Sequence, residues 1–188
     1  MPRKTPARDR LMGAAHELFY AHGTHATGID TITERAGVAR KSLYNNFASK
    51  DELVAAYIEE RHLQWLALYE ARLQEATTAR ERVLAIFDAY IDHADADYPD
   101  GFRGCGLLNA AAELPAGAPG REAVRRHKEH VEDLIFTNLL DGGEDARRGL
   151  AEHLSYLLEG AVSRAGLEGI GTRLRRARAI ASNLLEGR

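Results

Sequence analysis

The chain has 188 residues, of which 45% are hydrophobic and 28% are charged, and this length is sufficient for a sizeable hydrophobic core. Its single cysteine, Cys105, excludes a disulfide framework within the chain and suits a reducing compartment. No apolar run reaches the roughly 18 residues of a membrane span, and no signal-peptide core follows the basic N-terminus. The sequence therefore predicts a soluble cytoplasmic protein that has no contact with a membrane.

The charges divide the chain into a basic front and an acidic remainder. Residues 1–50 contain eight Lys and Arg against four Asp and Glu, whereas the remainder contains 17 against 24. A basic segment attached to an acidic body can approach a polyanion through that segment alone. The distribution favours a polyanionic partner for the front of the chain.

Helical periodicity begins within the first twenty residues. Apolar residues from Leu11 to Phe19 recur at the spacing of one helix face, and Gly23 predicts the end of that helix. Thr27 and Asp30 have the spacing of a capping box, which predicts that Thr27 caps a short helix over 29–36.

A second short helix is expected over 40–46, after a tight turn at 37–39. Leu43 and Phe47 are its expected inward contacts. Two short helices joined by a three-residue turn that contains glycine form a helix-turn-helix. In that motif the second helix enters the major groove of DNA, with its N-terminal residues nearest the base edges.

The remainder of the chain is also predicted to be helical. Ser49 with Glu52, and Thr78 with Glu81, have the spacing of further capping boxes, each of which opens a helix. No window shows sustained strand alternation, so the predicted fold is all-α with about nine helices. Further helices are expected over about 103–114, 124–139, 150–162 and 174–185, with a turn at 98–101 and a loop at 115–120.

A dozen residues of the front segment match one known family in order and spacing. They are found in Ala15-His16-Glu17-Leu18-Phe19, Gly23, Ala26-Thr27, Ile32, Ala36-Gly37-Val38, Leu43-Tyr44, Phe47 and Ser49-Lys50. Over about residues 8–57 the chain resembles the head of a tetracycline-repressor (TetR) family regulator. The resemblance implies a helix-turn-helix DNA-binding domain over 1–52 and a helical ligand-binding and dimerisation domain over 53–188.

The resemblance also implies which residues contact DNA. Residues that begin the second short helix fall where family members read bases or adjacent phosphates, and those that follow fall where they touch the backbone. The hydroxyl and amides at the start of the first short helix are expected to meet a phosphate. The expected DNA-binding residues are Thr27, Arg40, Lys41, Ser42, Tyr44, Asn46 and Lys50.

In this family the C-terminal body forms a dimer and holds a small-molecule pocket. Polar side chains set inside apolar stripes, together with bulky aromatic residues, fit such a pocket. The alternative is that these polar groups pair with one another in a filled core. The expected ligand-binding residues are Trp65, Phe87, Tyr90, Cys105, Leu108, Asn109, Glu113, His127, Asn138 and His153.

The last two helices carry wide apolar stripes, which suit either a four-helix interface between two subunits or a cover for the chain's own core. No cofactor is predicted. A metal site at His127 and His130, completed by His153 or Glu113, is the less favoured alternative to no metal.

The predicted function is that of a homodimeric repressor, which a small-molecule effector releases from a pseudo-palindromic operator in double-stranded DNA. Two alternatives stay open. The body could recognise a protein partner instead of a small molecule, or the chain could be an enzyme that uses the His and Glu residues of the body.

Overall fold

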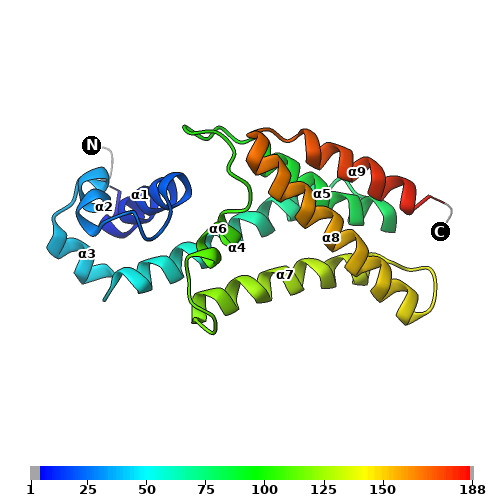
Figure 1. Ribbon diagram of the computed structural model, residues 1–188, viewed down its shortest axis with the longest axis horizontal. Helices are drawn as coiled ribbons and strands as arrows, with labels where there is room; N and C mark the ends of the chain where they lie inside the picture. The colour runs from blue at the N-terminus through cyan, green and yellow to red at the C-terminus, as the bar shows by residue number, and fades with distance from the viewer. Residues whose placement is uncertain (1–4, 187–188) are drawn as a thin grey trace. The chain divides into compact units, whose positions relative to one another are not determined.

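The computed structural model describes residues 5–186, and these residues form nine helices and no strand (Figure 1). The prediction of an all-α fold is confirmed. Arg3 and Lys4, which contribute to the basic front, lie outside the described residues. None of the helices formed by the described residues is long and apolar enough to cross a membrane.

The helices group into two compact units. The first unit comprises Met1–Arg61 and Gly106–Val124, and the second comprises His62–Cys105 and Arg125–Arg188. The first unit is therefore larger than the head predicted over 1–52, because a later segment of the chain joins it.

The first unit is built around α1 (Ala7–His22), which contacts α2 (Ile29–Ala36), α3 (Arg40–Asn46) and α6 (Gly106–Ala112). The apolar stripe of α1 is buried, as its spacing predicts. Gly23 ends α1 with a φ of 87°, and its N–H donates to the carbonyl of Phe19 at 3.0 Å.

The long helix α4 (Lys50–Leu73) and helix α7 (Pro119–Asn138) each contribute residues to both units. α4 begins at its predicted cap, because the Ser49 hydroxyl accepts the N–H of Glu52 at 3.1 Å. α7 begins earlier than the sequence predicts, since its first residue is Pro119, which lies in the predicted loop over 115–120. Proline suits this position, where the N–H would have no partner within the helix.

In the second unit α8 (Glu144–Glu168) packs on α9 (Thr172–Leu184), and α5 (Ala79–Asp95) contacts both, as Figure 1 shows. The capping box of Thr78 and Glu81 at the start of α5 is confirmed, with both of its hydrogen bonds present. Helix α8 approaches the loop before α6 closely at Gly166. A Cβ there would lie 2.6 Å from the backbone nitrogen of Gly104, so only glycine fits.

Acidic side chains along α5 form ion pairs with the neighbouring helices. The Asp88 carboxylate accepts two hydrogen bonds from Arg178 of α9, at 2.5 and 2.9 Å. One turn later Asp92 pairs with Arg72 of α4, and Asp95 pairs with Arg175 of α9. These pairs align α5 with the two helices beside it in the second unit.

Candidate functional site

The two short helices of the first unit are held at a fixed angle by the turn that joins them. Gly37 adopts the left-handed conformation, with φ 61° and ψ 42°, and the N–H of Val38 donates to the carbonyl of Thr33 at 3.0 Å. Arg10 of α1 donates through Nη1 to the carbonyls of Ala36 and Gly37, at 3.1 and 2.9 Å. The sequence does not predict this contact of Arg10, because it joins residues 26 positions apart in the chain.

One face of α3 is buried and the opposite face is exposed. Leu43 and Phe47 are almost fully buried, so the expectation that they point inward is confirmed. Arg40, Lys41 and Tyr44 are exposed on the other side. A short helix held by its apolar residues thus presents two cations and an aromatic hydroxyl outward, which is the chemistry that meets phosphates and base edges.

Arg40 is held by two neighbours on this exposed surface. Its Nη1 lies 3.0 and 3.3 Å from the carboxylate oxygens of Asp30 on α2. Its guanidinium carbon lies 5.8 Å from the centroid of the Tyr44 ring. The hydrogen bond with Tyr44 and the charge of Asp30 raise the pKa of Arg40 above its ordinary value.

Thr27 does not cap α2, and this prediction is wrong. The residue before the helix is Gly28, and no side chain caps the first turn. Thr27 is buried instead, and its hydroxyl donates to the carbonyl of Gly23 at 2.7 Å, with the carbonyl of Leu18 at 3.3 Å. Because the Thr27 hydroxyl is buried and hydrogen-bonded to carbonyls at the end of α1, it does not point toward the position expected for a phosphate at the start of α2.

The later residues of the predicted DNA surface make local contacts. Asn46 donates through Nδ2 to the carbonyl of Ser42 at 2.7 Å, one turn earlier in α3. Lys50 Nζ lies 3.4 Å from the carbonyl of His25. The DNA contacts of these residues stay predictions. Each side chain could exchange its hydrogen bond with a backbone carbonyl for one with a DNA phosphate.

Three of the residues predicted to bind ligand lie in the first unit. Leu108 and Asn109 belong to α6, and Leu108 is exposed. The Glu113 carboxylate accepts the hydroxyl of Thr24 at 2.8 Å and the N–H of His25 at 2.6 Å. These bonds outweigh the effect of burial and lower the pKa of Glu113. Glu113 thereby anchors the loop between α1 and α2, and its predicted role with a ligand stays a prediction.

The aromatic residues predicted to line a pocket lie together in the second unit. Trp65 stacks on Tyr69 with ring centroids 5.7 Å apart, and it also meets Tyr90 at 5.4 Å and His127 at 5.3 Å. Phe87 is fully buried. The indole Nε1 of Trp65 is buried and has no hydrogen-bond partner among the described residues.

His127 is buried beside a second histidine that the sequence did not single out. Its Nδ1 lies 2.8 Å from Nδ1 of His62, so one ring donates a hydrogen to the other. Burial, followed by the positive charge of Lys128, lowers the pKa of His127 to about 2. No three His, Cys, Asp or Glu side chains within residues 5–186 are placed to hold a metal ion.

Lys128 is a buried cation in the second unit that the sequence did not single out. Its ammonium lies 2.7 Å from Oε1 of Glu159, 3.2 Å from the hydroxyl of Tyr90 and 3.5 Å from the sulfur of Cys105. Although burial opposes it, these neighbours raise the pKa of Lys128 well above its ordinary value. A signal was present, because Lys128 falls four residues after the buried Val124 in the apolar stripe of α7.

Two other predicted ligand residues of the second unit have unlike surroundings. His153 is exposed on α8, because Leu154 and Leu158 take the inward face of that helix. The prediction that His153 lies among the apolar residues is therefore wrong. Both ends of the Asn138 side-chain amide are hydrogen-bonded within the chain. Its Oδ1 accepts a hydrogen bond from Arg82 Nε at 2.9 Å, and its Nδ2 donates to the carbonyl of Leu134 at 2.8 Å.

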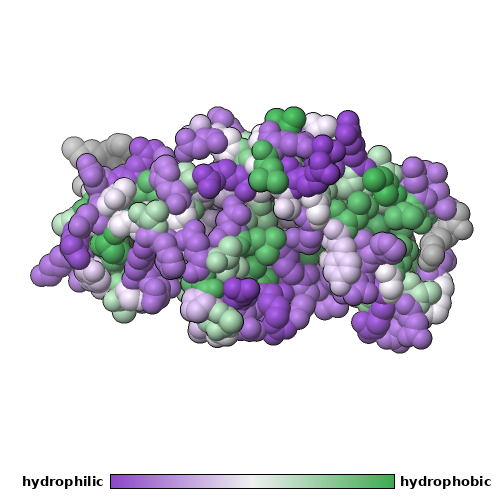
Figure 2. Space-filling model, viewed as in Figure 1, coloured by the Kyte–Doolittle hydropathy of each residue, from purple (hydrophilic) through white to green (hydrophobic). Residues whose placement is uncertain are grey.

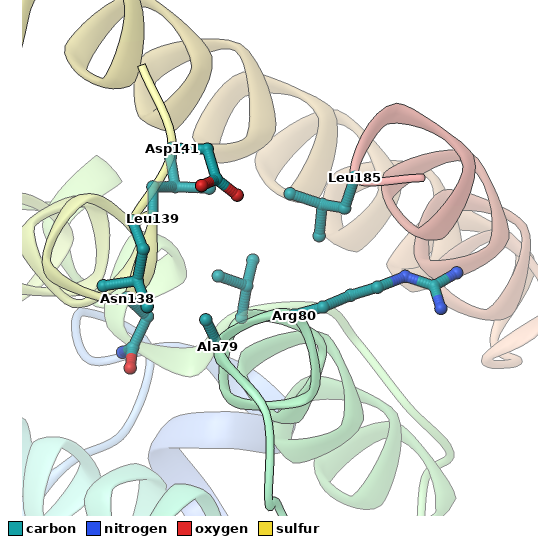
Figure 3. A pocket seen from close by; sticks show the side chains of 8 residues that line it. Ala79, Arg80, Asn138, Leu139, Asp141 and Leu185 are labelled. Carbon is teal, nitrogen blue, oxygen red and sulfur yellow. The ribbon is translucent and has the colours of Figure 1, made fainter. Parts of the chain in front are cut away.

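A small pocket lies at the far end of α7 in the second unit, with about 360 Å³ of empty space that is partly open to solvent. Asp141 and Leu185 face each other across it, and the amide of Asn138 turns away from its centre (Figure 3). Of the predicted ligand residues only Asn138 contributes to its wall. The pocket is lined by Ala79, Arg80, Val83, Asn138, Leu139, Leu140, Asp141 and Leu185.

The helix-turn-helix and the complete fold both have known relatives. Residues 11–57 match the family described as "Bacterial regulatory proteins, tetR family". The crystal structure of SCO4454, a TetR-family transcriptional regulator from Streptomyces coelicolor, is 31% identical. The match covers 95% of both chains with a TM-score of 0.84.

Curated relatives include transcriptional activators and transcriptional repressors. The HTH-type transcriptional activator FasR of Mycolicibacterium smegmatis is 32% identical over 141 residues, which are 75% of this chain and 63% of FasR. The chain thus spans less than two thirds of the length of FasR. The "Fatty acid metabolism regulator protein" of Bacillus subtilis is 23% identical over 178 residues, 94% of this chain and 79% of that protein. With a helix-turn-helix, an all-helical fold and relatives that are transcriptional regulators rather than enzymes, the chain belongs to the TetR family of DNA-binding transcriptional regulators.

Proposed function

We propose that this protein is a homodimeric repressor, and that a small-molecule effector bound in its body releases it from a pseudo-palindromic operator. The observation that carries the effector part is the buried indole N–H of Trp65, which has no hydrogen-bond partner among the described residues. Leaving such a group unpaired costs about 1–3 kcal/mol, and an acceptor atom on a bound ligand would recover it. The neighbouring rings of Tyr69, Tyr90 and His127 suit an effector that is largely apolar.

The DNA contacts that we propose are centred on α3. Arg40 and Lys41 begin this helix, Tyr44 follows one turn later, and all three are exposed. Ser42, Asn46 and Lys50 complete the surface, while the buried Thr27 is left out of it. In a dimer two such surfaces would enter successive major grooves, about 34–36 Å apart.

The dimer is proposed to form through α8 and α9. Tyr156 and Leu167 are 65% and 87% exposed, and Gly160 stands between them at the spacing of the same helix face. On α9, Ile180 and Leu184 are also about half exposed. Figure 2 shows hydrophobic areas of the surface near the end of α8 and along α9. Two amphipathic helices from each subunit can bury such faces in a four-helix interface.

The first experiment identifies the operator by sequencing the genomic fragments that the purified protein retains. Fatty acids are the first effectors to try, because the relative in Bacillus subtilis that matches 94% of this chain is named for fatty acid metabolism. A fatty acid that binds should release the operator, and the operator should weaken fatty acid binding by the same factor.

The variant Trp65→Phe tests the site itself, since it keeps an aromatic ring and removes the unpaired N–H. We expect weaker effector binding and an unchanged affinity for the operator. Ile86→Val, which changes a fully buried side chain of the same unit that is not among the expected ligand-binding residues, serves as the control for packing. A body that binds no small molecule and instead retains a protein would contradict the effector proposal.

A further inference from the structure

An acidic side chain stands beside the proposed DNA-binding surface of the first unit, where a negative charge opposes the approach of a polyanion. Asp30 lies in the first turn of α2, and 80% of its side chain is exposed. Its carboxylate lies 3.0 Å from Nη1 of Arg40, the first residue of α3. The pair therefore bridges the two helices of the motif on the outside of the turn.

The pair restricts Arg40, an exposed cation at the start of α3. Asp30 holds one nitrogen of the Arg40 guanidinium, and the ring of Tyr44 lies against its face. An exposed ion pair contributes little to folding stability, roughly 0.2–1 kcal/mol. Its position matters more, because a DNA phosphate that binds Arg40 must either share the guanidinium with the Asp30 carboxylate or displace it.

DNA phosphates and a correctly placed base differ in how well they can replace the Asp30 carboxylate as the partner of Arg40. A DNA phosphate can also accept paired hydrogen bonds from Arg40, but its negative charge is repelled by the Asp30 carboxylate nearby, whatever the DNA sequence. A guanine in the correct position offers two aligned acceptors, O6 and N7, to which an arginine can donate two hydrogen bonds. The geometry thus penalises contacts with the backbone more than contacts with a matched base.

We propose that Asp30 is a specificity-determining residue, which withholds Arg40 from phosphates and so lowers the affinity of the protein for DNA of random sequence. The inference rests on the proposed contact between Arg40 and DNA. Asp30 acts through Arg40, as a positioning residue, and the discrimination arises because the matched base replaces the ion pair better than a phosphate does.

The test compares Asp30→Asn with the unchanged protein on two DNA duplexes. One is a random-sequence duplex, and the other is the sequence that the unchanged protein selects from a random pool. For the random duplex, the association constant should rise by up to about fivefold for each Arg40 released. The slope of its logarithm against the logarithm of salt concentration should steepen by about 0.9 for each new phosphate contact. The ratio of affinities for selected and random DNA should fall.

Glu34→Gln is the matched control, because it removes the same charge from an exposed position four residues later on α2. Asp30→Asn should also be made in an Arg40→Ala background, where its effect should shrink to that of Glu34→Gln. The thermal midpoint of each variant establishes that the first unit is folded.

Equal effects of Asp30→Asn and Glu34→Gln would overturn the proposal, since they would indicate general charge repulsion. Weaker binding of Asp30→Asn to both duplexes would also overturn it. If Arg40→Ala alone leaves binding to both duplexes unchanged, the proposed DNA contact of Arg40 fails as well. That result is distinguishable from a failure of Asp30 alone.

Discussion

His127 is the residue whose protonation the tertiary structure constrains most clearly. In the unfolded chain an imidazole gains a proton near pH 6.5. In the folded protein its pKa is about 2, because burial disfavours the charged ring and Lys128 lies next to it in the chain. Between these two pH values the unfolded state binds a proton that the folded state does not.

The free energy of unfolding should therefore fall as the pH drops below about 6.5, by about 1.4 kcal/mol per pH unit for this residue. Chemical denaturation at a series of pH values measures the slope. His127→Leu should remove this part of the slope, whereas His153→Leu, at an exposed histidine, should leave it in place. Equal slopes for His127→Leu and the unchanged protein would contradict a neutral buried imidazole.

Lys50 stands at the start of α4, and its ammonium has no carboxylate partner among the contacts of the described residues. If it contacts the DNA backbone, Lys50→Ala should weaken binding to all sequences alike. The salt dependence of the association constant should become shallower by about one unit of slope. Titration of a labelled duplex at several salt concentrations measures both. A loss confined to the operator would instead indicate base reading.

Ion pairs between helices organise the second unit at the level of elements. Asp88 and Arg178 join α5 to α9 through two hydrogen bonds, and both side chains are less than 40% exposed. Asp95 and Arg175 join the same two helices but are more exposed. Screening by water weakens a pair as its exposure increases, so the two pairs should contribute unequally.

A double-mutant cycle with Asp88→Asn and Arg178→Gln should give a coupling energy of about 1 kcal/mol or more, because the contact is bidentate and partly buried. The matched cycle with Asp95→Asn and Arg175→Gln should give less than about 0.5 kcal/mol. Urea denaturation monitored by the helical signal gives the free energies. A larger coupling for the exposed pair would contradict the expected effect of burial.

At the scale of the whole molecule, the exposed face of α8 is the surface through which we propose that the chain dimerises. Leu167 is 87% exposed, and covering it in a subunit interface would remove its apolar surface from water. The spacing of Tyr156, Gly160 and Leu167 places all three on one side of the helix.

Leu167→Glu should dissociate the dimer at micromolar concentration, because the charge would be buried at the interface without a partner. Sedimentation equilibrium measures the change in mass. Leu140→Glu is the control, since Leu140 is 65% exposed but lies in the segment between α7 and α8. If Leu167→Glu remains dimeric, the interface lies elsewhere, and this face of α8 is not needed to bring two DNA-binding surfaces together.

The sequence by itself determined the helical fold and the helix-turn-helix, because both depend on interactions between residues close together in the chain. The stripe of α1, the turn at Gly37 and the caps at Ser49 and Thr78 are all local patterns of three to eight residues. Such patterns are visible in a single sequence, and the structure follows them to within a few residues.

Tertiary structure alone decided the partners of the polar side chains that contact distant parts of the chain. Thr27 has the right spacing for a cap, but the end of α1 competes successfully for its hydroxyl. Glu113 meets the loop at His25, which is 88 residues earlier in the chain, and Lys128 meets Glu159 31 residues later. Periodicity identifies which side of a helix is buried, whereas the partner of a buried charge depends on which helices pack together. The candidate site could therefore be predicted as a helix and a set of exposed cations, but not as the contact between Arg40 and Asp30.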